Sequence, residues 1–217
     1  APKEGPAFDL AIGVAILRAA DPSLLLDGAA FLGELALDGS VRGVTGVLPM
    51  ARCLAQAGMR HLIVAVENAE EAALAEGLDV FPATSLRACI EHLSGEHPLP
   101  SLVRGHVTPP REYEPDLAAV RGQGQAKRAL EIAAAGGHNL LMTGPPGAGK
   151  TMLARSVSSL LPDLRSDAAL EVAALYSLRA RLRDRHATPL PQPVPPPHPS
   201  SSAAGVGGGG TGTARPG

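Results

Sequence analysis

The order of apolar and polar positions divides the first hundred residues into short helices and strands. Apolar residues recur around most of a helix in residues 8–19, which predicts a helix buried on nearly all sides. Three short apolar runs have the length of buried strands: residues 31–37, 61–66 and 78–81. Helices are predicted between and after them, at residues 49–57, 69–76 and 85–93. The alternation predicts an α/β unit.

Polar and glycine residues mark the ends of several of these elements. Asp38 and Gly39 predict a tight turn after the first strand. Asn68 and Thr84 stand where the side chain of a helix N-cap is expected. Gly58 is expected to end the helix at residues 49–57.

Prolines and glycines then indicate how the chain is organised. Residues 1–98 are predicted to form a first domain, 99–115 a proline-containing linker and 116–184 a second domain. Within the second domain, we expect helices at residues 125–135, 152–161 and 166–183 and a buried strand at residues 138–143. Residues 185–217 are expected to be a disordered low-complexity tail. Pro and Gly make up 15 of the last 31 residues. The segment therefore has too few apolar groups to offset the entropy that it would lose on ordering.

One motif in the second domain carries specific chemistry, a phosphate-binding loop of the pattern G-x-x-x-x-G-K-[ST]. It consists of Gly144, Pro145, Pro146, Gly147, Ala148, Gly149, Lys150 and Thr151. The glycines allow a phosphate to approach the backbone, Lys150 supplies a cation for the β- and γ-phosphates, and the Thr151 hydroxyl is a ligand for Mg²⁺. A chance glycine-rich turn is the alternative, which a preceding strand and a following helix make improbable. The motif therefore predicts binding of a nucleoside triphosphate with Mg²⁺, which the family resemblance given below specifies as ATP.

Composition narrows the possible partners and the compartment. The 217 residues have a net charge of −2, so no overall basic field indicates a nucleic-acid or membrane partner. Aromatic residues make up only 2%, so the cores are expected to be aliphatic. Cys53 and Cys89 have no metal-ligand spacing and are expected to be buried, reduced thiols. We find no signal peptide and no apolar stretch of transmembrane length, which favours the cytoplasm.

Two segments resemble a known family. Residues 121–139, running into the phosphate loop, resemble the start of the AAA+ module of magnesium-chelatase-like ATPases. Residues 3–10 and 31–39 resemble the Lon-protease-like domain, of the ribosomal S5 domain 2-like type, that precedes this module in the YifB/ComM branch. The resemblance implies a partial Lon-like α+β domain followed by the N-terminal part of a P-loop AAA+ domain.

The resemblance also implies which activities to expect. Lon-type peptidases use a Ser nucleophile and a Lys base, and the matching places here hold Ala7 and Leu48, so no peptidase activity is expected. An AAA+ ATPase also needs Walker B acids, a sensor and an arginine finger. We identify none of these. Asp163, Asp167 and Glu171 are interpreted as a solvated helix face.

Three functions stay open on these grounds. The resemblance implies a fragment, diverged near its end, of a cytoplasmic ring-forming homo-oligomer that couples ATP hydrolysis to remodelling of DNA, for example branch migration. A subunit for metal insertion, as in magnesium chelatase, is the first alternative, although the Lon-like part argues against it. A non-catalytic nucleotide-binding or assembly module is the second.

Overall fold

The protein is described here by a computed structural model that covers residues 5–26, 28–102 and 116–178, with Gln192, Val194, Ser200 and Ser201. The chain divides into two compact units. The first consists of Ala1–Thr108 and Leu170–Thr188, and the second of Pro109–Ala169 and Pro189–Gly217. The predicted tail lies outside the described residues except for the four named above, as does most of the predicted linker.

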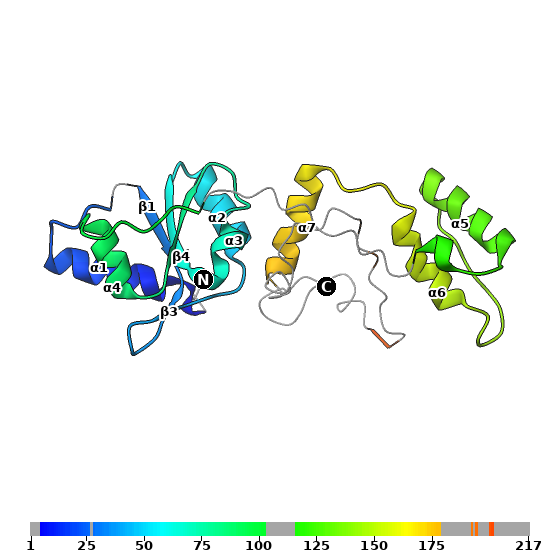
Figure 1. The fold of residues 1–217 in the computed structure, drawn as a ribbon, viewed down its shortest axis with the longest axis horizontal. Helices are drawn as coiled ribbons and strands as arrows, with labels where there is room; N and C mark the ends of the chain where they lie inside the picture. The colour runs from blue at the N-terminus through cyan, green and yellow to red at the C-terminus, as the bar shows by residue number, and fades with distance from the viewer. Residues whose placement is uncertain are drawn as a thin grey trace. The chain divides into compact units, whose positions relative to one another are not determined.

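A parallel sheet of three strands forms the centre of the first unit (Figure 1). Its order is β1 (Ala29–Leu32), β4 (His61–Ala65) and β5 (Asp79–Ala83), with Ala30 opposite Leu62 and Leu62 opposite Val80. Continuous runs of aliphatic residues form these strands because both faces of the sheet are covered. The observed fold is therefore mixed α/β with a parallel sheet.

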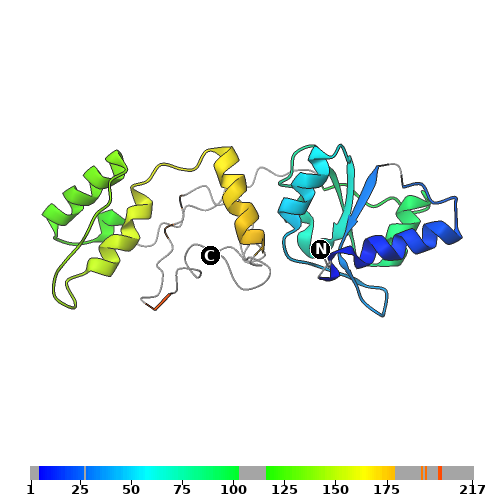
Figure 2. The same cartoon turned by 180° about the vertical axis from the view of Figure 1, so that it is seen from behind.

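Four helices cover the two faces of this sheet, as Figures 1 and 2 show from opposite sides. Helices α1 (Asp9–Ala20) and α4 (Leu86–Leu93) pack on one face, where Phe31 and Ile63 point. Helices α2 (Val47–Gln56) and α3 (Ala69–Ala72) pack on the other, against Leu62 and Val64. The alternation of side chains along each strand thus divides the unit into two aliphatic cores.

The single strand expected at residues 31–37 is interrupted at Gly33. The backbone N–H of Gly33 donates to the carbonyl of Ala7 at 3.0 Å, and its carbonyl accepts from Leu10 N at 3.1 Å. A Cβ at Gly33 would lie 2.8 Å from Val41 Cγ1, so the close approach requires glycine here. The chain continues as β2 (Glu34–Leu35), which pairs antiparallel with β3 (Val41–Arg42) across the predicted turn. β1 therefore ends early, because the backbone groups of Gly33 bond to Ala7, in the 3-10 turn η1 (Pro6–Phe8), and to Leu10 just after it.

The two predicted caps differ in outcome. Asn68 occupies the N-cap position of α3 as predicted, but it makes no capping bond, because its side chain binds the backbone of Val44 instead. Helix α4 is capped by Ser85, whose hydroxyl accepts from Ala88 N at 3.2 Å, one residue after the predicted Thr84. A short turn, η2 (Val66–Asn68), leads into α3, which is shorter than predicted.

The second unit is helical in its described part. It contains η3 (Leu117–Ala119), α5 (Gly124–Gly136), α6 (Lys150–Arg155) and η4 (Ser156–Ser159), and α7 (Ser166–Leu178) begins in it. Leu117, Val120, Leu130 and Leu153 form its buried core. No described helix of the protein is long and apolar enough to span a membrane.

The strand predicted at residues 138–143 is absent. These residues have no regular structure, and Leu141 is 88% exposed. A parallel strand requires a neighbour to pair its backbone groups, and the described part of the second unit contains no other strand. The apolar run at residues 138–143 was therefore not enough, by itself, to predict a strand.

The cysteines differ in a way that the sequence did not indicate. Cys89 is fully buried, as expected, and burial raises the pKa of its thiol to about 12. Cys53, on α2, is exposed, so the expectation that it is buried was wrong.

We therefore expect a thiol reagent to modify one cysteine per native chain at pH 8. Only the thiolate reacts, and at Cys89 it is both rare and inaccessible. Reaction with an aromatic disulfide, followed by peptide mass analysis, should place the label on Cys53. Cys53→Ser should remove this rapid reaction. Rapid labelling of Cys89 in that variant would contradict the burial of Cys89 in the core.

Candidate functional site

The phosphate-binding motif forms an exposed loop that leads directly into a helix. Gly147 and Gly149 have φ values of 80° and 81°, a left-handed conformation that strains other residues. Helix α6 starts at Lys150, and Leu153 N donates to the carbonyl of Gly149 at 3.0 Å as its first turn closes. The described geometry therefore has the turn that the motif requires, without the strand expected before it.

The Lys150 side chain folds back over the loop. Its Nζ donates to the carbonyl oxygens of Gly144 and Pro145 at 2.8 and 2.7 Å. These two bonds hold the ammonium group against the backbone of the loop that the motif uses to surround a phosphate. A phosphate oxygen that replaced either carbonyl would gain a charge-assisted hydrogen bond.

Gln123, for which the sequence predicted no role, contacts this loop from the beginning of α5. Its Nε2 donates to the carbonyl of Ala148 at 3.5 Å, the limit of a hydrogen bond. Among the described residues, Gln123 is the only non-glycine residue with positive φ, at 55°. Its position in the unusual sequence Gly-Gln-Gly was the available signal.

The expected metal ligand, Thr151, lies exposed on the first turn of α6. No group of three or more His, Cys, Asp or Glu side chains in the described part of the chain has the arrangement of a metal site. Asp167 lies near the start of α7, 3.9 Å from the guanidinium of Arg165. This loop offers Mg²⁺ one hydroxyl ligand and no set of carboxylates. The other ligands would come from phosphate oxygens of a nucleotide and from water.

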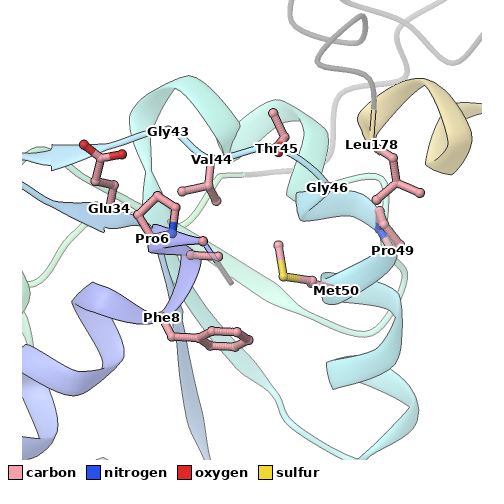
Figure 3. A pocket seen from close by; sticks show the side chains of 12 residues that line it. Pro6, Phe8, Glu34, Gly43, Val44, Thr45, Gly46, Pro49, Met50 and Leu178 are labelled. Carbon is pink, nitrogen blue, oxygen red and sulfur yellow. The ribbon is translucent and has the colours of Figure 1, made fainter. Parts of the chain in front are cut away.

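A pocket lies in the first unit, beside one of the two places that resemble the peptidase residues. Figure 3 shows Phe8 and Met50 among the side chains that line a pocket of about 650 Å³. Ala7 lines this pocket. Leu48 does not, because its side chain is fully buried in the core beneath α2. The structure therefore brings only the first of the two places to the pocket.

A buried polar network supports the wall of this pocket. Asn68 is 0% exposed, and its amide accepts from Val44 N at 2.8 Å and donates to the Val44 carbonyl at 3.0 Å. Glu71 accepts from Asn68 Nδ2 at 3.2 Å and from Leu48 N at 3.0 Å. The Ser177 hydroxyl also donates to Glu71. The carboxylate thus satisfies a free N–H at the start of α2, an interaction that the helix dipole favours.

Comparison with known proteins identifies the family to which the chain belongs. The family described as "Magnesium chelatase, subunit ChlI" matches residues 116–217, and "Subunit ChlI of Mg-chelatase" matches residues 1–68. YifB of Escherichia coli is 46% identical over 181 residues, which are 82% of this chain and 35% of YifB. The competence protein ComM of Haemophilus influenzae is 44% identical over 183 residues, 82% of this chain and 36% of ComM.

These matches define the class as magnesium-chelatase-like. More particularly, the chain belongs to the magnesium-chelatase-like proteins of the YifB/ComM type. It spans about a third of the length of YifB and of ComM.

Proposed function

We propose that this chain binds ATP with Mg²⁺ through the loop at residues 144–151, as part of an AAA+ ATPase module. The observation that carries the proposal is the position of Lys150 Nζ over the carbonyls of Gly144 and Pro145. The loop is exposed to solvent, so a triphosphate can reach it without any rearrangement of a core. Lys150 would bind the β- and γ-phosphates, and Thr151 would bind the metal.

The proposal includes the cellular role and the first unit. We infer a parent protein that assembles as a homo-oligomeric ring in the cytoplasm and couples ATP hydrolysis to DNA remodelling. The first unit would be a non-proteolytic, Lon-like domain, since Ala7 lines the pocket and Leu48 is in the core. The name of ComM, a competence protein, supports a role in DNA metabolism.

Metal insertion is the second candidate, and the descriptions of both matching families favour it. It uses the same loop and differs in the partner on which the ATPase acts. Release of nucleotide in response to branched DNA, but not to a magnesium-free porphyrin, would favour the DNA role.

Replacing Lys150 with Ala tests the nucleotide site. We expect the affinity for a fluorescent ATP analogue in the presence of Mg²⁺ to fall at least about tenfold, because a charge-assisted contact to phosphate contributes about 1.5–3 kcal/mol. Fluorescence titration measures this change. Lys127→Ala is the matched control, since it removes a lysine from α5 outside the motif. Equal affinity of the unsubstituted chain and of Lys150→Ala for the analogue would refute the assignment of this loop as a nucleotide site.

A further inference from the structure

The segment of residues 98–102 runs from the turn after α4 to β5, the edge strand of the sheet in the first unit. Leu102 pairs with Val80 of this strand, and its backbone N–H donates to the Val80 carbonyl at 2.8 Å. The backbone N–H of Leu99 donates to Nδ1 of His92, in the last turn of α4, at 3.0 Å. The residues on either side of Leu99 are prolines, which have no N–H to donate. The bond to His92 therefore holds the first half of this segment.

This bond requires a neutral imidazole ring. In neutral His92, Nδ1 accepts the hydrogen bond and Nε2 carries the proton. Protonation adds a hydrogen to Nδ1, so that two donors then face each other. The donor of Leu99 is a backbone N–H and cannot become an acceptor, and turning the imidazole over would place a carbon atom in the position of Nδ1. The bond to Leu99 is therefore lost when His92 becomes charged.

The surroundings of His92 keep the ring neutral at pH 7. The ring packs against Phe81, with the two ring centres 4.7 Å apart. It also lines a small pocket of about 130 Å³ together with His61, on β4, and with aliphatic side chains. Burial and the nearby His61 lower the pKa of His92 below its usual value. The midpoint of protonation therefore lies below the value of about 6.5 for an unperturbed His.

Other titratable groups lie on the elements that pack around His92. Oδ2 of Asp79, at the start of β5, lies 3.9 Å from Nε2 of His61, and Oε2 of Glu91, on α4, lies 3.8 Å from Nδ1 of His97. Helices α1 and α4 also carry Asp9, Arg18, Arg87 and Cys89. Among these groups, His61 is the neighbour whose charge opposes protonation of His92.

The side chain of Leu99 packs on the core that α1 and α4 share. Leu10 and Val14 of α1 are fully buried in this core, whereas Ile12 is 57% exposed and Ile16 is 65% exposed. The expectation that α1 is buried on nearly all sides was therefore wrong for one face. The apolar contact of Leu99 does not depend on charge, so loss of its hydrogen bond should loosen the segment rather than unfold the unit.

We propose that His92 is a pH-dependent latch: the neutral ring holds residues 98–102 on the first unit, and the protonated ring releases them. The chain continues from Leu102 through residues 103–115 to the described part of the second unit. The latch therefore determines where the chain leaves the first unit on its way to the second. It is closed at neutral pH and opens on acidification.

Nuclear magnetic resonance on the full chain tests the latch. We expect the protection of the Leu99 amide against hydrogen exchange, corrected for the direct effect of pH, to fall about threefold or more between about pH 7.5 and pH 4.5, because one hydrogen bond contributes a factor of this order. The midpoint of this fall should coincide with the pKa of His92, measured from its ring signals. Protection that stays constant while His92 becomes protonated, or a His92 ring that stays neutral throughout this range, would overturn the proposal.

Two substitutions of His92 separate the latch from general effects of acid. The side-chain oxygen of His92→Asn can accept from Leu99 N but does not titrate, so the protection should persist at both pH values. His92→Leu has no acceptor and should lose the protection at both. His97→Gln is the matched control, because His97 is the next, exposed His in the chain and its replacement should leave the pH dependence of Leu99 unchanged. Circular dichroism confirms that each variant is folded, and a fall of protection on acidification that persists in His92→Asn would also overturn the proposal.

Discussion

Replacing Asn68 with Ala is expected to destabilise the first unit by about 2–4 kcal/mol. The substitution leaves the N–H and the carbonyl of Val44 without their partner in a site from which water is excluded. It also removes one of the donors to Glu71, whose carboxylate supports the start of α2. An unpaired buried polar group costs about 1–3 kcal/mol, and two groups are affected here.

The core cysteine provides the measurement. In a Cys53→Ser background, the remaining thiol is that of Cys89, which lies in the core between the sheet, α1 and α4. Its reaction in increasing urea reports the opening of the first unit specifically. Glu67→Ala is the matched control, because Glu67 is the exposed neighbour of Asn68 in the chain. A change of less than about 1 kcal/mol for Asn68→Ala would mean that water replaces the amide.

Asn68→Asp adds a dependence on pH with a defined sign. The introduced carboxyl can accept from Val44 N, but when ionised it faces the Val44 carbonyl and the Glu71 carboxylate. Its pKa in the folded state must therefore rise above the value in the unfolded chain. A group of this kind contributes stability below its unfolded pKa and loses it as pH increases. Asn68→Asp should therefore lower the free energy of unfolding, relative to the unsubstituted chain, by more at pH 7 than at pH 4.

The elements that the sequence predicted correctly are those with local signals. The β4 strand is a continuous aliphatic run, α5 lies within one residue of its predicted bounds, and the Asp38-Gly39 turn connects β2 and β3. Each of these depends on residues that are close together in the chain. A pattern over a few residues is enough to specify them.

The errors have a common physical origin in long-range contacts. Asn68 has the sequence position of a cap, but its side chain binds Val44, 24 residues earlier. Gly33 ends β1 because Ala7 and Leu10 take its backbone hydrogen bonds. At the candidate nucleotide site, the motif predicts eight loop residues, and their binding role stays a prediction. Gln123 was not assigned because its contact spans 25 residues. Partners at such distances are chosen by the tertiary fold and leave no periodic signal.

The last expectation concerns turnover of ATP. Hydrolysis needs a metal held by acidic side chains, an oriented water and positive charge in the transition state, and an arginine finger alone contributes about 10³–10⁵-fold. Lys150 and Thr151 supply only part of this set. The acidic residues that follow the loop are Asp163, Asp167 and Glu171. The last two are on α7, and none follows a described strand, as a Walker B acid does.

We therefore expect the chain to release phosphate at a rate indistinguishable from the background, even with Mg²⁺ and branched DNA present. A coupled phosphate assay over several hours, with Lys150→Ala as the control, measures the difference. Steady release that Lys150→Ala abolishes would contradict this expectation. Three variants would then identify the carboxylate that acts in hydrolysis: Asp163→Ala, Asp167→Ala and Glu171→Ala. Only replacement of the residue that holds the metal or orients the water should abolish phosphate release while nucleotide binding persists.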